Sequence, residues 1–198
     1  EATVSNLTQV SYGGVTFSYD PAWVTSIDGV TEAAVTPSEG GSAVMDGVQP
    51  ENIRFDFTGY PLQDTFHQPA IHVYPLQEFS ALDEAFAAQI SDLSIFLGEK
   101  PVSVDSNVSI PFMPIFYAGQ VFHSNMAYID TPNLIGVRFL TLYAQYMAPI
   151  NNHDMFYTFQ GITKDGQYLI SAVLPMSQVS LPENADNPPG GDWNAFTN

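Results

Sequence analysis

The segment TFHQPAIHVYP, residues 65–75, carries two of the chain's four histidines, His67 and His72. Imidazole nitrogens are common zinc ligands, so this close spacing raises the question of a metal site. In an extended strand, however, an odd separation places side chains on opposite faces, and five residues span about 16 Å. No HxH or HxxxH spacing lies nearby. The spacing therefore predicts a loop histidine and a surface strand histidine, with no metal bound.

A second polar cluster, INNHDMF at residues 150–156, contains His153 and Asp154. Asn and Asp favour turns for backbone reasons alone, so the cluster is also typical of an ordinary loop. His123 lies in a predicted strand, where a single histidine is usually a hydrogen-bonded structural residue. The candidate binding residues are therefore His72, His123, His153 and Asp154. They form one site only if His72 or His123 approaches the other two across a sheet.

The signatures of known catalytic sites are missing from the sequence. It contains no GxSxG, P-loop, GxGxxG or HExxH motif. It also contains no cysteine, so neither disulfides nor thiolate chemistry are available. These observations favour a non-catalytic protein without a cofactor. Since carboxylates are its abundant ligands, we expect any divalent cation to be a hard ion such as Ca²⁺, bound weakly.

The elements that must position these residues are mostly strands. Alternating apolar and polar residues predict strands at 15–19, 53–58, 70–75, 119–130 and 134–146, and a hairpin over 155–176. The hairpin turn is marked by Lys164-Asp165-Gly166. Pro69 and Pro75 bracket the strand at 70–75, which suits an edge strand or a short one.

One long helix is predicted over residues 79–97. Its apolar stripe has helical spacing and consists of Phe79, Leu82, Phe86, Ile90, Leu93 and Leu97. Ser80 followed by acidic residues is typical of an N-terminal cap, and Gly98 before Pro101 is typical of a helix end. We expect this helix to pack on one face of a sheet. The order of elements predicts an α+β fold with a largely antiparallel sheet of about six to seven strands.

Length and composition predict a single domain spanning residues 1–198. A chain of this size buries roughly 70 % of its unfolded surface, so it needs neither disulfides nor a structural metal. Residues 24–50 carry four acidic residues and no basic one, and are predicted to be a long acidic loop with a short strand or helical turn around 31–36. The segments 1–11 and 181–198 are predicted to be tails. In the second of them, Trp193 and Phe196 are apolar enough to dock onto the domain.

The charge balance excludes several classes of partner. The sequence has 21 acidic residues and four Lys and Arg, a formal net charge of −17 at pH 7. Nucleic acids and anionic membrane surfaces require a basic patch, so neither is an expected partner. No apolar run is as long as a membrane-spanning helix, which needs about 18 residues or more. A protein or a small ligand remains as the partner.

The composition also indicates where the protein works. The chain begins EATVSNLTQV, has few lysines, and is rich in Ser, Thr, Asn, Gly and Pro. This is typical of the mature part of an exported protein or lipoprotein. We therefore expect an extracytoplasmic location: secreted, periplasmic or lipid-anchored at a bacterial cell surface.

Three stretches resemble the PsbP-like class, which includes an extrinsic photosystem II subunit and related exported bacterial proteins. They are VTFSYDPAW, the strand-to-helix stretch IHVYPLQEFSALDEAF, and the late hairpin YTFQGITKDGQYLISAVLP. The resemblance spans about residues 15–175 and implies an α+β domain that binds or assembles rather than catalyses. It implies no site residue, and the acidic segment 24–50 has no counterpart in that pattern.

Two functions fit these observations. The first is a non-catalytic exported or cell-surface binding or assembly module. The alternative is a small-ligand sensor or hydrolase with an aromatic-lined pocket between helix and sheet, for which the chain's ten tyrosines and fourteen phenylalanines supply ample material. A cleft that contains His153 and Asp154 would favour the alternative, and a shallow surface would favour the module.

Overall fold

The structure is a computed structural model that describes residues 7–146, 148–186 and 191. Its order of elements is β1 (Thr8–Tyr12), β2 (Val15–Tyr19), β3 (Ser26–Glu32), β4 (Asn52–Thr58), β5 (Ala70–Pro75), α1 (Leu76–Leu82), α2 (Glu84–Glu99), β6 (Gly119–Asp130), β7 (Leu134–Ala144), β8 (Phe156–Thr163) and β9 (Tyr168–Pro175).

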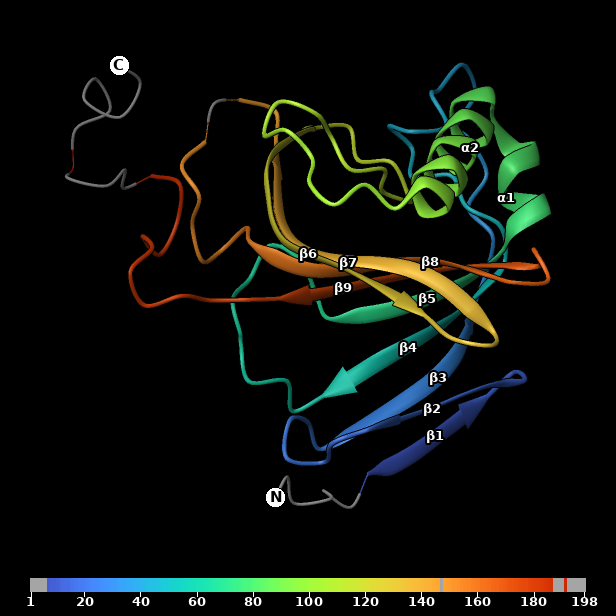
Figure 1. Ribbon diagram of the computed structural model, residues 1–198, viewed down its shortest axis with the longest axis horizontal. Coiled ribbons are helices and arrows are strands. Elements are labelled where there is room, and N and C mark those ends of the chain that lie inside the picture. Colours follow the sequence, from blue (N-terminus) through green and yellow to red (C-terminus); the bar gives the residue numbers. More distant parts are fainter. Residues whose placement is uncertain (1–6, 147, 187–190, 192–198) are drawn as a thin grey trace.

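A seven-stranded sheet forms the centre of the fold, in the order β3-β4-β5-β9-β8-β7-β6 (Figure 1). Every neighbouring pair in this sheet is antiparallel. The predicted α+β class with a largely antiparallel sheet is therefore confirmed. β5 is short, as predicted, but it lies between β4 and β9 and is not an edge strand.

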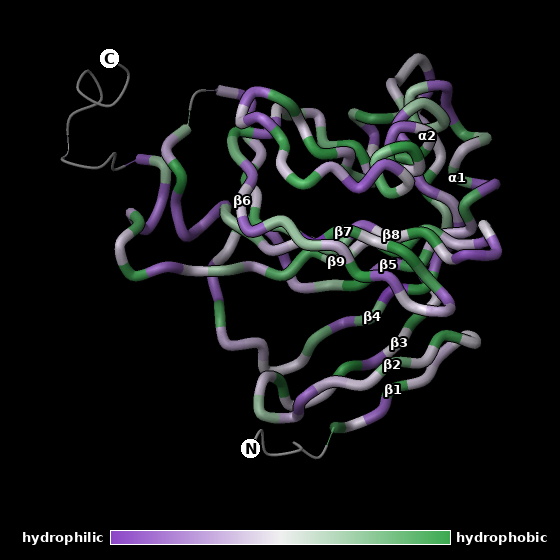
Figure 2. The backbone as a smooth tube through the Cα atoms, viewed as in Figure 1, coloured by the Kyte–Doolittle hydropathy of each residue, from purple (hydrophilic) through white to green (hydrophobic). Residues whose placement is uncertain are grey.

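The strands form where polar and apolar residues alternate, because successive side chains of a strand point to opposite faces. Figure 2 shows this alternation along β4, where Ile53, Phe55 and Phe57 alternate with polar residues. The β8–β9 hairpin turns at Gly166, whose φ of 71° suits glycine and disfavours other residues. The predicted hairpin over 155–176 is confirmed.

The prediction of one long helix over 79–97 is wrong, because the chain breaks between α1 and α2 at Asp83. The backbone of Asp83 is extended, with φ −161° and ψ 148°, and its carboxylate accepts a hydrogen bond from the Ala85 amide at 2.8 Å. Asp83 therefore caps α2, in the place that the sequence assigned to Ser80. The apolar stripe did not reveal the break, since Phe79 of α1 and Phe86 of α2 enter the same core.

The sheet separates two apolar cores. On one face, α1 and α2 bury Phe79, Phe86 and Leu93 with sheet residues such as Phe139 and Phe156. On the other face, the hairpin β1–β2 covers a smaller core of four buried residues, Val24, Ile27, Phe55 and Val73. Figure 1 shows the helices and this hairpin on opposite sides of the sheet.

Two predicted irregular segments contain strands. The acidic segment 24–50 includes the edge strand β3, and its remainder is held by backbone hydrogen bonds between Val35 and Gln49. The predicted tail 1–11 includes most of β1, which packs beside β3 at the close contact between Tyr12 and Gly29. These strands carry too little apolar alternation to stand out from loops. Trp193 and Phe196 lie outside the described residues.

Candidate functional site

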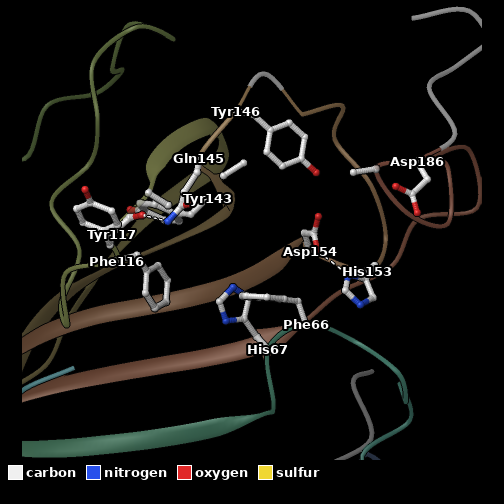
Figure 3. A pocket seen from close by; sticks show the side chains of 13 residues that line it. Phe66, His67, Phe116, Tyr117, Tyr143, Gln145, Tyr146, His153, Asp154 and Asp186 are labelled. Atoms are coloured by element: carbon white, nitrogen blue, oxygen red, sulfur yellow. Dashed lines mark hydrogen bonds and ion pairs between the residues drawn. The ribbon is translucent and has the colours of Figure 1, made fainter. Parts of the chain in front are cut away.

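A pocket of about 610 Å³ opens at one end of the sheet, where β7 ends and β5, β6 and β8 begin (Figure 3). Segments far apart in the sequence contribute its lining: Phe66, His67, Phe116, Tyr117, Ala118, Tyr143, Ala144, Gln145, Tyr146, His153, Asp154, Ala185 and Asp186. Neither helix contributes a residue. The helix–sheet interface is instead filled by fully buried side chains such as Phe79 and Leu93. The pocket therefore lies at the end of the sheet and not between helix and sheet, where the sequence led us to expect it.

Aromatic rings form the inner wall of the pocket. The imidazole of His67 stacks on Phe116, with ring centroids 5.2 Å apart, and meets the edge of Phe156 at 4.5 Å. Tyr143 packs against Phe116 at 5.2 Å and lies parallel to Phe156 at 6.2 Å. Because Phe156 is fully buried, this wall continues directly into the main core. The aromatic wall is therefore packed against the main core.

His67 is neutral at physiological pH, because burial among these rings lowers its pKa from 6.5 to about 4. The nearby Asp154 opposes this shift, and His153 adds to it. Within the described part of the chain, the His67 ring nitrogens form no hydrogen bond with another side chain. These nitrogens are therefore polar atoms within the aromatic part of the pocket wall.

Two glutamines, one buried and one half-buried, hold the loop that carries Phe116. Gln160 of β8, itself fully buried, accepts a hydrogen bond from the Met113 amide at 2.9 Å. Gln120 of β6 accepts one from the Ile110 amide at 2.8 Å and donates to the Tyr143 hydroxyl at 2.8 Å. These bonds join a loop without secondary structure to β6 and β8, and so hold its aromatic residues against the sheet.

The turn at 151–154 is organised by Asn151, whose side chain is fully buried. Its Oδ1 accepts hydrogen bonds from the amides of His153 and Asp154 at 3.1 and 3.0 Å. Its Nδ2 donates to the Pro149 carbonyl and to Asp154 Oδ2, both at 3.0 Å. The sequence indicated either a turn or a site here, and the structure contains the turn at the edge of the pocket.

This turn brings two neighbouring side chains together. His153 Nδ1 lies 2.5 Å from Asp154 Oδ1. The backbone carbonyl of His153 accepts from the Phe66 amide at 2.8 Å, which joins this turn to the segment that carries His67. Asn152 binds the segment 178–182 through both its side chain and its amide. The turn is therefore tied to two other segments, one of which carries the lining residues Phe66 and His67.

The other predicted site residues lie elsewhere. His72 stacks on Tyr74 at 5.4 Å, and its Nδ1 lies 3.1 Å from Asn52 Oδ1 and 3.4 Å from Glu32 Oε2. Burial lowers its pKa, although Glu32 opposes that shift. His72 does not line the pocket, so it belongs to a polar group on β3, β4 and β5.

His123 has a structural role on β6. Its Nε2 lies 3.1 Å from the carbonyl oxygens of both Asp105 and Val108. Since carbonyl oxygens only accept, Nε2 carries the proton and fastens the loop after α2 to the edge strand. Neither His72 nor His123 therefore approaches the His153–Asp154 pair.

The histidine that lines the pocket together with His153 and Asp154 is His67, which the sequence predicted to be a loop histidine. It lies 86 positions before His153, so no local pattern could have joined the two. The only signal in the sequence was the adjacent aromatic residue Phe66, which also lines the pocket. Among the residues that the structure describes, no group of three or more His, Asp or Glu side chains is placed to hold a metal ion.

A second, smaller pocket of about 300 Å³ lies beside Trp23, on the face of the sheet that the β1–β2 hairpin covers. It is lined mainly by apolar residues, including Phe17, Tyr60 and Leu174, and Trp23 is 70 % exposed beside it. It contains one carboxylate, that of Asp20, and no histidine. The larger pocket is therefore the better candidate for a specific site.

No described helix is long and apolar enough to cross a membrane. Comparison with known proteins identifies no relative, since no protein-family model, no curated protein and no solved structure matches the chain significantly. Function must therefore be argued from the pocket itself.

Proposed function

We propose that the protein is a non-catalytic small-ligand sensor, the alternative of the two functions, which takes a small, largely apolar ligand into the aromatic pocket that contains His153 and Asp154. The observation that carries this proposal is the convergence of five separate chain segments on one cavity of about 610 Å³ with aromatic walls. Ligand sites in proteins typically have volumes of about 300–1,000 Å³ and mostly apolar linings with a few polar groups. This pocket has that size and that composition.

The polar groups of the pocket are few and fixed. His67 is held between rings, and the His153–Asp154 pair is held by Asn151. Fixed polar groups in an apolar pocket orient a ligand, because a ligand that mismatches them leaves buried groups unpaired. They support recognition of a defined small molecule over nonspecific apolar binding.

The same pair of residues is also the observation that favours hydrolysis as a second function. A His–Asp pair activates a side-chain nucleophile in many hydrolases, and this requires a hydroxyl or thiol within hydrogen-bond reach. The described lining contains no serine, threonine or cysteine, and its hydroxyl groups belong to Tyr117, Tyr143 and Tyr146. Tyr143 is a poor nucleophile because burial raises its pKa. Binding is therefore the better-supported function.

We propose further that this protein works outside the cytoplasm, at or near a cell surface, as its lysine-poor composition, rich in Ser, Thr, Asn, Gly and Pro, suggests. The resemblance to the PsbP-like class agrees with a binding or assembly role and remains a prediction. Fractionation of the source cells with an antibody against the chain tests the location. Recovery of the protein in the cytoplasmic fraction would contradict it.

A fragment screen by saturation-transfer NMR tests the binding function. Ala118→Trp places an indole at the pocket wall, and Val102→Trp adds the same side chain at a position that is 99 % exposed and does not line the pocket. We expect aromatic fragments to give signals with the wild type and with Val102→Trp, and to lose them with Ala118→Trp. Equal signals from all three proteins, or no signal from any, would contradict the proposal.

A further inference from the structure

The pocket wall contains no lysine or arginine, and the reason lies in the placement of the chain's four such residues. Lys100 and Lys164 both contact the Asp130 carboxylate, at 2.6 and 2.7 Å. Arg54 pairs with Glu32 and Asp56 on β3 and β4. The fourth, Arg138, lies over the ring of Tyr157 and donates to its hydroxyl. All four are engaged outside the pocket lining.

The pocket does contain carboxylates. Asp154 and Asp186 both line it, and Figure 3 shows the Asp154 carboxylate between Tyr146 and the side chains of Phe66 and His67. Each oxygen of Asp154 has one protein partner, His153 or Asn151. A carboxylate oxygen has two lone pairs, so each keeps an acceptor site for a ligand.

The aromatic wall adds to the negative potential of these carboxylates. The faces of phenylalanine and tyrosine rings attract cations within about 6 Å, and the attraction increases when water is excluded. Five such residues line the pocket: Phe66, Phe116, Tyr117, Tyr143 and Tyr146. His67 does not offset this potential, because it carries no charge at neutral pH.

From this combination we infer that the ligand is an organic cation, an amine or quaternary ammonium group on an apolar body. The inference rests on the proposed binding function and names the class of ligand. The apolar body lies against the rings, and the cationic group lies near Asp154. The net charge of −17 strengthens the long-range attraction for such a ligand and repels its anionic analogues.

Three probes with the same phenyl ring and two-carbon chain test the charge directly. They are phenethylamine, which is cationic at pH 7.5, 2-phenylethanol, which is neutral, and phenylacetate, which is anionic. Isothermal titration should give an affinity for the amine about tenfold higher than for the alcohol, because only the ammonium group pairs with the Asp154 carboxylate and is attracted by the ring faces. We expect no measurable binding of the acid.

A matched pair of variants assigns the effect to the pocket. Asp154→Asn removes the carboxylate and keeps an oxygen for Asn151, whereas Asp92→Asn makes the same charge change on the exposed surface of α2. The amine should lose about tenfold in affinity with Asp154→Asn, because its charge-assisted hydrogen bond to the carboxylate is lost, and none with Asp92→Asn. The alcohol should not change with either variant. Equal affinities of wild type for amine and alcohol would overturn the cation inference alone. Binding of none of the three probes would overturn the pocket function as well.

Discussion

His153 and Asp154 are neighbours in the sequence, and their side chains meet with Nδ1 2.5 Å from Oδ1. In a strand these two side chains would point to opposite faces. They meet because Asn151 accepts hydrogen bonds from both of their backbone amides and closes the turn. The geometry of the candidate site therefore depends on a residue that does not itself line the pocket.

Replacement of that residue should destabilise the protein. Asn151→Ala removes four hydrogen bonds of a fully buried side chain, so we expect the free energy of unfolding to fall by about 2–3 kcal/mol. Urea unfolding measures the change. Asn107→Ala, at an exposed position, is the control and should stay within about 0.5 kcal/mol of the wild type. A similar small effect from both variants would show that Asn151 does not hold the turn.

His67 should make stability depend on pH in a defined range. The unfolded chain binds a proton at this residue below about pH 6.5, whereas the folded protein does so only below about pH 4. Since the unfolded state then holds more protons, folding is disfavoured as pH falls from 6.5 to 4. The stability that neutral His67 contributes is fully present above about pH 6.5.

This effect can be isolated by comparing wild type with His67→Gln at pH 7 and pH 4. Carboxylates titrate in both proteins, so the difference between the two reports on the histidine. Urea unfolding should show the wild type losing about 2–3 kcal/mol more than the variant over this interval. Equal losses would mean that burial does not hold this imidazole neutral.

Gln160 should matter for both stability and pocket geometry. Its replacement by Leu leaves the buried Met113 amide without its acceptor, which should cost about 2–3 kcal/mol of unfolding free energy. We also expect faster hydrogen exchange at the Met113 amide, because this bond holds the loop that carries Phe116. Gln9→Leu, at an exposed position of β1, serves as the control. An unchanged exchange rate at Met113 would contradict the anchoring role.

The helix break at Asp83 predicts a capping effect. Asp83→Ala removes the carboxylate that accepts from the Ala85 amide, and should lower the free energy of unfolding by about 1 kcal/mol. Asp92→Ala changes the same residue type in the exposed middle of α2, where there is no free amide to cap. Chemical unfolding of both variants measures the difference. A single continuous helix would make the two variants equivalent.

The sequence was sufficient for six of the seven strands of the sheet and insufficient for the pocket. The strands β4 and β7 could be predicted because alternation is a local property that the sheet preserves. The break at Asp83 could not, because the apolar stripe is the same in one helix and in two that share a core. β3 was hidden by its acidic and glycine-rich composition, which is also typical of loops.

The pocket could not be predicted because it depends on contacts between distant segments. The sequence singled out His153 and Asp154, and both line the pocket. It paired them with His72 or His123, whereas His67 is the histidine that lies beside them. That choice depends on the backbone bond between Phe66 and His153, which no spacing in the sequence encodes.

The central claim is that the pocket of about 610 Å³ is the ligand site, and amide chemical-shift mapping tests it most directly. Phenethylamine and the best fragment from the screen would each be titrated into ¹⁵N-labelled wild-type protein. The account predicts that the largest shifts cluster at residues 66–67, 116–118, 143–146 and 153–154. Shifts that cluster around Trp23 and Tyr60, or that scatter over the surface without saturating, would contradict it.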